Sequence, residues 1–412
     1  MKIIVSTHAW LPVGGGRFVM AKAAETFLNA GFNVYITSTF KFCRQEFLKL
    51  YNVDLSNVKH YSLPLEMPKF FGLYQRLISS IPLRKAIKKE KPDFVFTDNE
   101  LYKPILGLKK KYGFKLVEYI HFPFKLIQLI FSSPFKATKI FSEDIRSAIE
   151  TYIKDTELYH KKYEKGLWRL YFNIWLKFYR IIARDNPFYS DDLVIVNSKY
   201  IARLVKLLWH REPTVIYPPV KISDLALNAN NQFEDRDDAV VMLGRITPEK
   251  NFETVVEAVA KSKYKPKLRI IGGITVANYP YLERLKNLCK KRNINVEFHI
   301  NVPRSEVVKL LTTSKIFVHA CIGEHFGIAV VEGMAAGLPV IVHKSGGTYQ
   351  DIINHGTYGR YYETVEELAE GIDEFLSNPE KWKKYHELSL TRASAFSEEE
   401  FSRKLLRAIK NI

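Results

Sequence analysis

The stretch GEHFGIAVVEGMAAGLPVIVHKSGG, at residues 323–347, contains the pattern that decides the fold. A β-branched run, KIFVHA at 315–320, comes before it, and a second one, PVIVHK at 339–344, lies near its end. Between these runs we expect an apolar helix from about Gly327 to Ala336. Strand, helix and strand in this order predict a parallel sheet covered by helices.

Two glutamates in this stretch, Glu324 and Glu332, point to a ligand site. Seven residues separate them, too many for adjacent helical turns, so we expect Glu324 at the helix entrance and Glu332 about one turn inside. The partly positive N-terminus of the helix suits a phosphate. Glu332 is then placed to accept hydrogen bonds from a ribose, and Glu324 from sugar hydroxyls. The alternative, two solvated surface charges, is disfavoured by the glycines and small residues around them.

The alternation of strand and helix extends along the rest of the chain. The other strands expected in the same half are AVVMLG at 239–244, LRIIGG at 268–273 and NVEFHI at 295–300. Those of the first half are KIIVST at 2–7, NVYITS at 33–38, DFVFT at 93–97, KLVEYI at 115–120 and DLVIVN at 192–197. We therefore predict an α/β protein of two Rossmann-like, doubly wound domains that face each other across a cleft.

The boundary between the two halves is marked by Pro218-Pro219 and by the polar run NANNQFEDRDD at 228–238. Paired prolines cannot continue a helix or a central strand, and the Asn/Asp run cannot build a core. The expected parts are a first domain, a linker, a second domain and a C-terminal helix that packs back on the first domain, at residues 1–215, 216–238, 239–395 and 396–412.

The composition describes a folded protein with a net charge of +18. Cys43, Cys289 and Cys321 form no CxxC pair, which argues against a disulfide framework or a zinc site and favours a reducing cytoplasm. No stretch reaches the roughly 18 uninterrupted apolar residues of a spanning helix, so we expect a soluble or peripheral protein. The charge predicts attraction to an anionic partner, unless it only reflects a lysine-rich proteome.

The segment from about 124 to 185 interrupts the alternation, and we expect it to be an aromatic and basic insertion that faces a membrane. Its second part, GLWRLYFNIWLKFYRII at 166–182, is typical of a helix lying in a membrane interface. The alternative is an ordinary helix packed on the domain core. The side chains expected to contact the acceptor or an anionic membrane are Trp168, Arg169, Trp175, Lys177 and Arg180, with Arg17 near the N-terminus. Nucleic acid is not expected, because the basic residues are spread along the chain.

Two further loops suit anionic ligands. Gly14-Gly15-Gly16 follows the first strand, where glycines let the backbone approach a ligand and a helix N-terminus offers free N–H groups; alternatively it is only a tight turn. An NAD-type site is disfavoured, because the loop is not GxGxxG and no acidic residue closes the second strand. GRITPEKN at 244–251 places Arg245 and Lys250 where they can clamp a diphosphate, unless the loop is a solvated basic turn.

Taken together, GRITPEKN, the spaced glutamates and AAGLPVIVHKSGG resemble glycosyltransferase family 4 over essentially the whole chain. The resemblance implies the GT-B fold and transfer of a sugar from a nucleotide sugar with retention of configuration. It also implies that no metal and no other cofactor is needed. The catalytic residues it implies are His121, Arg245, Lys250 and Glu324. The donor-binding residues, including loops near the base, are Gly15, Gly16, Arg245, Lys250, Gly272, Val302, Glu324, His325, Phe326, Gly327, Ile328 and Glu332.

A closer likeness lies within the family. HAWLPVGGGRFVMAKA, YIHFP at 119–123, IVNSKYIARLV at 195–205, VIYPPV at 215–220 and the aromatic-basic stretch resemble the lipid-linked-oligosaccharide α-1,2-mannosyltransferases. These use GDP-mannose at the membrane face, which implies a lipid-linked glycan acceptor and peripheral attachment on the cytoplasmic side. His121 then matches a histidine near the transferred sugar, where it either orients the sugar or handles a proton.

Two departures from that subgroup leave the acceptor open. Its eukaryotic members carry an N-terminal membrane anchor without a counterpart in this sequence, and Arg17 stands where an acidic residue usually follows the glycine loop. One alternative is a family 4 enzyme that uses UDP-glucose or another nucleotide sugar to build polysaccharide or glycolipid. Another is a catalytically idle, basic protein that binds membrane or nucleic acid. The intact donor-site cations and glutamates argue against an idle site.

Overall fold

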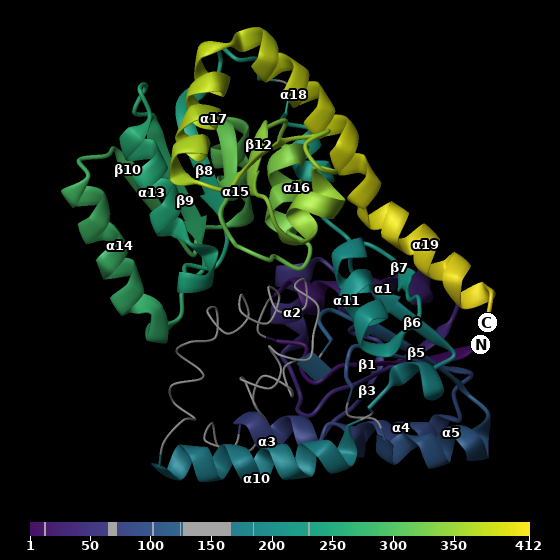
Figure 1. Cartoon of the computed structure of the whole chain (residues 1–412). Helices are drawn as coiled ribbons and strands as arrows, with labels where there is room; N and C mark the ends of the chain where they lie inside the picture. The colour runs from purple at the N-terminus through teal and green to yellow at the C-terminus, as the bar shows by residue number, and fades with distance from the viewer. Residues whose placement is uncertain are drawn as a thin grey trace. The chain divides into compact units, whose positions relative to one another are not determined.

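The computed structural model describes residues 1–11, 14–64, 72–100, 103–123, 125–126, 166–183, 185–229 and 231–412. The chain forms two compact units, residues 1–219 with 401–412, and residues 220–400. Each unit contains one parallel sheet with helices packed against it (Figure 1). Most of the insertion predicted at 124–185 lies outside the described residues. Its described part is mainly a helix, α10 (Gly166–Ile182).

Seven parallel strands form the sheet of the first unit, in the order β3-β2-β1-β4-β5-β6-β7. Their bounds are β1 (Lys2–Ser6), β2 (Asn33–Thr37), β3 (Lys59–Tyr61), β4 (Phe94–Thr97), β5 (Lys115–Ile120), β6 (Leu193–Val196) and β7 (Thr214–Val215). In β1, Ile3 and Val5 belong to one hydrophobic core and Ile4 to another. Because both faces of the sheet are covered, its central strands are continuous apolar runs rather than alternating ones.

Helices cover both faces of this sheet. One core contains side chains of α1 (Gly15–Asn29), α2 (Arg44–Tyr51) and α19 (Glu398–Lys410). The other contains side chains of α4 (Ser80–Glu90) and α5 (Leu106–Tyr112). The remaining helices are α11 (Lys199–Trp209), which packs on β6, and α3 (Gly72–Leu77), which packs against α10. The C-terminal helix α19 brings Phe401, Leu405 and Ile409 into the first core.

Six parallel strands form the sheet of the second unit, in the order β10-β9-β8-β11-β12-β13. Their bounds are β8 (Asp237–Leu243), β9 (Lys267–Gly272), β10 (Val296–Ile300), β11 (Ser314–His319), β12 (Val340–His343) and β13 (Arg360–Tyr362). The helices are α12 (Ser223–Ala226), α13 (Phe252–Lys261), α14 (Tyr279–Lys291), α15 (Arg304–Thr312), α16 (Ile328–Ala335), α17 (Val365–Ser377) and α18 (Pro379–Ala393). Short helical turns also occur at Lys103–Ile105, Pro187–Tyr189, Pro248–Lys250, Val276–Asn278, Thr348–Ile352 and Ser394–Phe396.

The predicted fold class is confirmed, because both sheets are doubly wound. Strand order reverses between β1 and β4 in the first sheet and between β8 and β11 in the second. In open parallel sheets, ligands bind beyond the carboxyl ends of the strands at such a reversal. These two points are therefore where a site is expected in each unit. Among the described residues, no helix has the length and apolarity needed to cross a bilayer.

The segment expected to be a linker at 216–238 differs from that expectation, because most of it belongs to the second unit. Arg236 is buried and donates to the backbone carbonyls of Ala229, Asn231, Ser314 and Ala336. Its guanidinium also lies over the Trp382 ring, 5.2 Å from the ring centroid. The polar run builds no core of its own, and one buried arginine fixes it to the body of the unit.

Candidate active site

Lys250 and Glu324 form the centre of a polar cluster in the second unit. Lys250 lies in the turn after β8, and Glu324 in the loop after β11. Lys250 Nζ is 2.5 Å from Glu324 Oε2, and His319 Nε2, at the end of β11, is 3.3 Å from the same oxygen. Neighbouring strands that end at the same edge thus bring the three side chains together, as the sequence predicted for two of them.

Lys250 and Glu324 are both ionised. Burial opposes the charge on Lys250, but the charges of Glu324 and Cys321 raise the Lys250 pKa above its ordinary value. Burial also opposes the charge on Glu324, yet the Lys250 charge and the His319 hydrogen bond hold its pKa well below the ordinary value. Burial lowers the pKa of His319, so its ring is neutral near pH 7 and donates Nε2–H to Glu324.

The same place has the donor atoms of a metal site. His319, Cys321 and Glu324 offer ligand atoms that all lie within 4.8 Å of one another. Imidazole, thiolate and carboxylate are ligands that zinc accepts. Lys250 Nζ, however, lies at the Glu324 carboxylate, where a cation would bind. In this arrangement the ammonium supplies the positive charge of the site.

Two glycines after β12 hold the Glu324 loop in place. A Cβ on Gly346 would lie 2.4 Å from the Glu324 carbonyl oxygen, and one on Gly347 would lie 2.3 Å from the His325 carbonyl oxygen. Gly347 N–H donates to the Glu324 carbonyl at 2.7 Å, and Gly323 N–H donates to Ser345 Oγ at 2.8 Å. The SGG motif therefore lets two loops pack backbone to backbone beside the cluster.

Helix α16 begins after Gly327, whose φ of 106° requires glycine. The preceding Phe326 side chain is buried against Phe396, so only its backbone is available to a ligand. His325 and Ile328 flank this turn and are half-buried. The turn thus combines a restricted backbone with the positive end of a helix, beside the Glu324 loop.

Glu332, inside α16, is held by an arginine that the sequence reading missed. Arg304, at the start of α15, forms an ion pair with Glu332. It also donates to Asp224 through Nε at 2.9 Å and through Nη2 at 3.0 Å. Burial raises the pKa of Glu332, with a contribution from Asp224, against the opposing charge of Arg304. The only signal in the sequence was that Arg304 follows the turn at Val302-Pro303.

Arg245, Gly272 and Val302, three further predicted donor residues, lie at the same edge of this sheet, whereas the predicted Gly15 and Gly16 belong to the first unit. The Arg245 side chain is 74% exposed and pairs with Glu249 at 3.5 Å, so it is free to reorient toward a ligand. Gly272 is required, because a Cβ there would lie 1.8 Å from the Gly244 carbonyl oxygen. Val302 is half-buried between β10 and α15. Arg245 acts electrostatically on Lys250, lowering its pKa slightly against the larger effect of Glu324.

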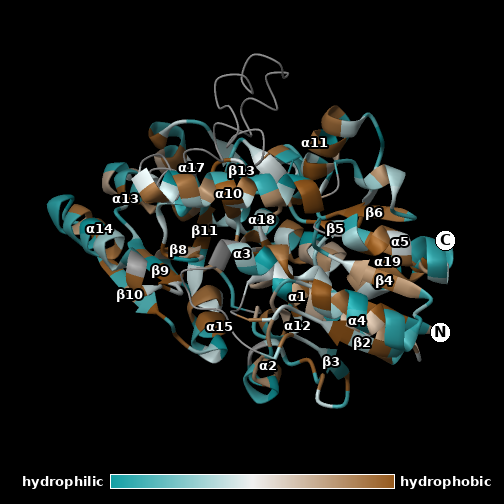
Figure 2. Cartoon of the chain, turned by 90° about the horizontal axis from the view of Figure 1, so that it is seen from below, coloured by the Kyte–Doolittle hydropathy of each residue, from teal (hydrophilic) through white to brown (hydrophobic). Residues whose placement is uncertain are grey.

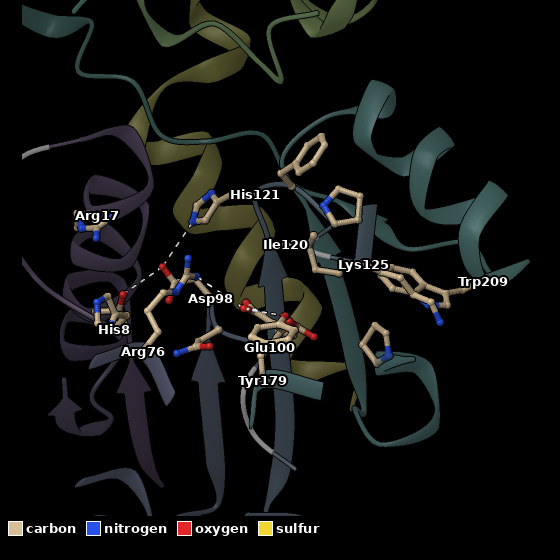
Figure 3. Close-up of a pocket in the computed structure, with 16 residues that line it drawn as sticks. His8, Arg17, Arg76, Asp98, Glu100, Ile120, His121, Lys125, Tyr179 and Trp209 are labelled. Carbon is tan, nitrogen blue, oxygen red and sulfur yellow. Dashed lines mark hydrogen bonds and ion pairs between the residues drawn. The ribbon is translucent and has the colours of Figure 1, made fainter. Parts of the chain in front are cut away.

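The first unit has a pocket of about 300 Å³ at the carboxyl ends of β1, β4 and β5 (Figure 3). Thr7 and His8 follow β1, Asp98 follows β4, and His121 follows β5. The remaining lining residues include Arg17, Arg76, Glu100, Lys125, Tyr179 and Trp209. The predicted residues His121 and Arg17 thus lie in one pocket, at the reversal point of the sheet.

His121 is fixed from three sides. Its Nε2 lies 3.7 Å from Asp98 Oδ2, its carbonyl accepts from Asn197 Nδ2 at 3.0 Å, and its ring packs against Tyr119. A Cβ on Gly16 would lie 3.1 Å from Nε2, so the glycine loop leaves room for the ring. Gly15, beside it, is exposed.

Asp98 is the charged partner in this pocket that sequence reasoning missed. It accepts from Thr7 Oγ1 at 3.1 Å. Burial opposes its charge, but the His121 ring, whose Nε2 lies 3.7 Å away, and the charge of Arg17 lower its pKa. Burial, followed by the charges of Arg76 and Arg17, lowers the pKa of His8 to about 3, so His8 is neutral. Asp98 directly follows the predicted strand DFVFT, which was a usable signal.

A second ionic group closes the pocket on the side of α10. Arg76 Nη2 lies 3.7 Å from Glu100 Oε1, and Tyr179 Oη donates to the same oxygen at 3.1 Å. Tyr179 and Trp175 lie on the buried side of α10. A membrane contact by Trp175, which the sequence suggested, is wrong, because the side chain is only 2% exposed and packs against Phe172 and Tyr179.

Comparisons with known proteins agree with this geometry. The family model described as Glycosyltransferase Family 4 matches residues 13–224, and that of Glycosyl transferases group 1 matches residues 225–389. The GDP-Man:Man(3)GlcNAc(2)-PP-Dol alpha-1,2-mannosyltransferase of Dictyostelium discoideum is 28% identical over 83% of this chain and 68% of its own length. The protein of the same name from Xenopus laevis is 28% identical over 82% of this chain and 70% of its own.

Solved structures show the same fold. Anabaena HepE in complex with UDP and glucose has a TM-score of 0.65 and 16% identity, with all of both chains covered. WaaG, a glycosyltransferase involved in lipopolysaccharide biosynthesis, has a TM-score of 0.62 and 16% identity, with 98% of each chain covered.

Two doubly wound units, each with polar groups at the carboxyl ends of its strands, define the GT-B fold. Within that class, the chain belongs to glycosyltransferase family 4. The resemblance found in the loop motifs is therefore confirmed, and the protein is a glycosyltransferase.

Proposed function

We propose that the protein transfers mannose from GDP-mannose to a lipid-linked oligosaccharide at the cytoplasmic surface of a membrane. The observation that carries the proposal is the ionised Lys250–Glu324 pair at the carboxyl ends of β8 and β11. The donor and acceptor come from the names of relatives such as the Dictyostelium and Xenopus mannosyltransferases, which match most of this chain. Retention of configuration and independence of metal belong to the same proposal.

In this proposal the second unit binds the donor. Lys250 places a point charge on the diphosphate, and the exposed Arg245 adds a bidentate guanidinium. Glu332, held by Arg304, accepts from the ribose hydroxyls. The bond between C1 of the sugar and the diphosphate oxygen breaks, and GDP leaves with the bonding electron pair. Positive groups already in place stabilise that developing charge, which is the main electrostatic contribution to the rate.

The pocket of the first unit receives the acceptor sugar. Its carboxylates Asp98 and Glu100 accept hydrogen bonds from sugar hydroxyls, and His121 lies where it orients a hydroxyl. The new bond forms between C1 and the acceptor oxygen, and the hydroxyl proton leaves to the diphosphate or to water. Arg17 adds a positive charge to this pocket, which favours an acceptor or donor group with negative charge nearby.

A panel of nucleotide sugars tests the donor. GDP-mannose at about 100 times its Kd is expected to stabilise the protein by about 2.7 kcal/mol, which raises Tm by roughly 3 °C. The control is Lys250→Met, which should lose most of this shift. Stabilisation by UDP-glucose, with transfer from UDP-glucose and none from GDP-mannose, would refute the donor assignment.

The rest of the proposal is tested on the reaction itself. With a lipid-pyrophosphate oligosaccharide as acceptor, the product is expected to contain one added α-linked mannose. Addition of EDTA should leave the rate unchanged, because Lys250 supplies the positive charge at Glu324. A β-linked product, or a rate that falls with EDTA and returns with a divalent ion, would contradict the mechanism.

Asp98 is expected to act as a positioning residue for His121. Asp98→Asn keeps the shape but removes the charge beside the ring, so kcat should fall by roughly 10–100-fold, with the KM for the donor nearly unchanged. Because the folded pKa of Asp98 is lowered, its stabilising effect is present above about pH 4 and is lost as pH falls through the folded pKa. The stability deficit of the variant should therefore be constant from pH 5 to 8.

The control for this change is Asp54→Asn, which removes one charge from an exposed aspartate of the same unit. Steady-state kinetics of both variants give the comparison. An unchanged kcat in Asp98→Asn, or an equal loss in Asp54→Asn, would show that Asp98 does not position His121.

A further inference from the structure

Helix α10 presents a row of large apolar side chains to solvent. Five residues make up this apolar row, and they are 42 to 85% exposed: Leu167, Leu170, Ile174, Phe178 and Ile181. Their spacing of three and four residues places them within an arc of about 80° on a helix of 3.6 residues per turn. Isolated exposed apolar residues are ordinary, but a continuous row along one helix marks an interaction surface.

A row of positive charge runs beside the apolar row. Arg169, Lys177 and Arg180 are exposed, and α10 contains no acidic residue. Helices α4 and α5 lie along the same lower side of the first unit (Figures 1 and 2). Helix α4 adds the exposed residues Ile81, Arg84, Lys85, Lys88 and Lys89. The surface is therefore apolar and strongly basic together.

The opposite side of α10 is anchored in the protein. Phe172, Trp175 and Leu176 pack with Leu77 of α3 in one hydrophobic cluster. Tyr179, in the same cluster, reaches the pocket and donates to Glu100 at 3.1 Å (Figure 3). One helix thus lines the pocket with its inner side and exposes apolar and basic side chains on its outer side.

Charge decides which partner fits the outer side. A second copy of the chain would place like charges opposite each other, since neither α10 has an acidic residue to pair with Arg169, Lys177 or Arg180. An anionic bilayer offers both complements, because its acyl region accepts the apolar row and its headgroups accept the basic side chains.

We propose that the outer side of α10 is a docking surface for an anionic lipid bilayer, with the helix lying in the plane of the interface. Docking there places the pocket that Tyr179 lines next to the lipid surface, where a lipid-anchored acceptor presents its sugars. The link to the acceptor rests on the proposed function, whereas the docking surface itself does not.

Vesicle sedimentation tests the surface with the full chain. Wild-type protein should bind phosphatidylcholine vesicles that contain about 30% phosphatidylserine, and bind pure phosphatidylcholine vesicles much more weakly. Leu170→Glu with Phe178→Glu should weaken binding by at least about 10-fold, because two apolar anchors are lost. Arg169→Gln, Lys177→Gln and Arg180→Gln together should weaken it by about 100-fold and reduce its salt dependence, because the basic residues of α4 remain.

The matched control is Leu48→Glu with Tyr264→Glu, which adds the same charge at exposed apolar sites elsewhere. It should bind vesicles nearly as well as wild type. The glutamine triple variant changes only surface residues, so it remains informative if the glutamate pair fails to fold. Wild type that does not bind at low salt, or α10 variants that bind as well as wild type, would overturn the proposal.

Activity separates this inference from the proposed function. The α10 variants should transfer normally to a water-soluble oligosaccharide acceptor and should lose transfer to a vesicle-embedded one. A chain that binds vesicles through α10 but transfers no mannose keeps the docking surface and loses the proposed function. If the α10 changes leave transfer on vesicles unaffected, the proposed docking surface is wrong and the proposed function stands.

Discussion

Replacing Glu324 with glutamine is expected to lower the transfer rate by roughly 10²–10³-fold. Glu324 Oε2 holds Lys250 at 2.5 Å and accepts from His319 at 3.3 Å, so the carboxylate fixes the cation that faces the donor in the proposed function. Glutamine has nearly the same shape but no charge, which leaves a largely buried ammonium without its partner. Single-turnover kinetics with GDP-mannose measure the loss.

Stability must be separated from activity in this variant. Removing one member of a buried ion pair costs about 3–5 kcal/mol, whereas removing both often costs little. Glu324→Gln combined with Lys250→Met should therefore recover much of the lost stability and none of the activity. The control is Glu366→Gln, which breaks a solvent-exposed pair with Lys261 and should change stability little. Full activity in Glu324→Gln would remove this pair from the donor site.

The pH dependence of the stability lost in Glu324→Gln follows from the shifted pKa values of Glu324 and Lys250. The folded pKa of Glu324 is lowered, so its stabilising effect is complete above the unfolded pKa of about 4.3 and is lost as pH falls through the folded pKa. The folded pKa of Lys250 is raised, so its effect is complete below about 10.4 and is lost as pH rises through the folded pKa. The stability deficit of Glu324→Gln should be constant between pH 5 and 9.

Local patterns were enough to predict the elements that carry the site. The apolar runs at 315–320 and 339–344 became β11 and β12, and the helix expected from Gly327 to Ala336 became α16 within one residue at each end. Strands and helices of this kind are set by side-chain periodicity and by glycines at their ends, which act over a few residues. The resemblance to glycosyltransferase family 4 then predicted that Lys250 and Glu324 belong to one site.

The partners of those residues were not predictable in the same way. Arg304 reaches Glu332 across 28 positions and Asp224 across 80, and nothing local singles it out from the other arginines. Asp98 pairs with His121 only because β4 and β5 are neighbours in the sheet. Which residues form an ion pair depends on the order of the strands in the sheet. The sequence pattern predicts the class of fold but not these individual pairs.

Helix α10 shows a different limit. Its aromatic and basic composition indicated a helix in a membrane interface, but two apolar arcs are present and only packing decides which one is buried. Contact with α3 buries the arc with Trp175, so the aromatic residues that suggested a membrane are partly core, and Leu and Ile residues are exposed instead. The helix predicted to contact a membrane is therefore the same, but the side chains that form the contact surface are different from those predicted.

Arg304→Met is expected to destabilise the protein by about 2–3 kcal/mol and to weaken donor binding. The change leaves Glu332 and Asp224 without their shared cation, and the loss is at the lower end for a buried pair because a third of the Arg304 side chain is exposed. Arg292→Met, which breaks a more exposed pair with Glu257, should cost less than about 1 kcal/mol. Chemical denaturation gives both values, and equal losses would contradict the network.

Two further readouts distinguish the ion network from simple packing. Arg304 binds Asp224 with two nitrogens, at 2.9 and 3.0 Å, so Arg304→Lys keeps the charge but loses the bidentate contact. This variant should therefore recover only part of the stability that Arg304→Met loses.

The folded pKa of Glu332 is already raised, and losing the arginine raises it further. A raised carboxyl pKa means that the folded state binds more protons, so stability falls as pH rises. The deficit of Arg304→Met should therefore be larger at pH 8 than at pH 5, and a deficit independent of pH would show that Glu332 does not depend on Arg304 for its charge.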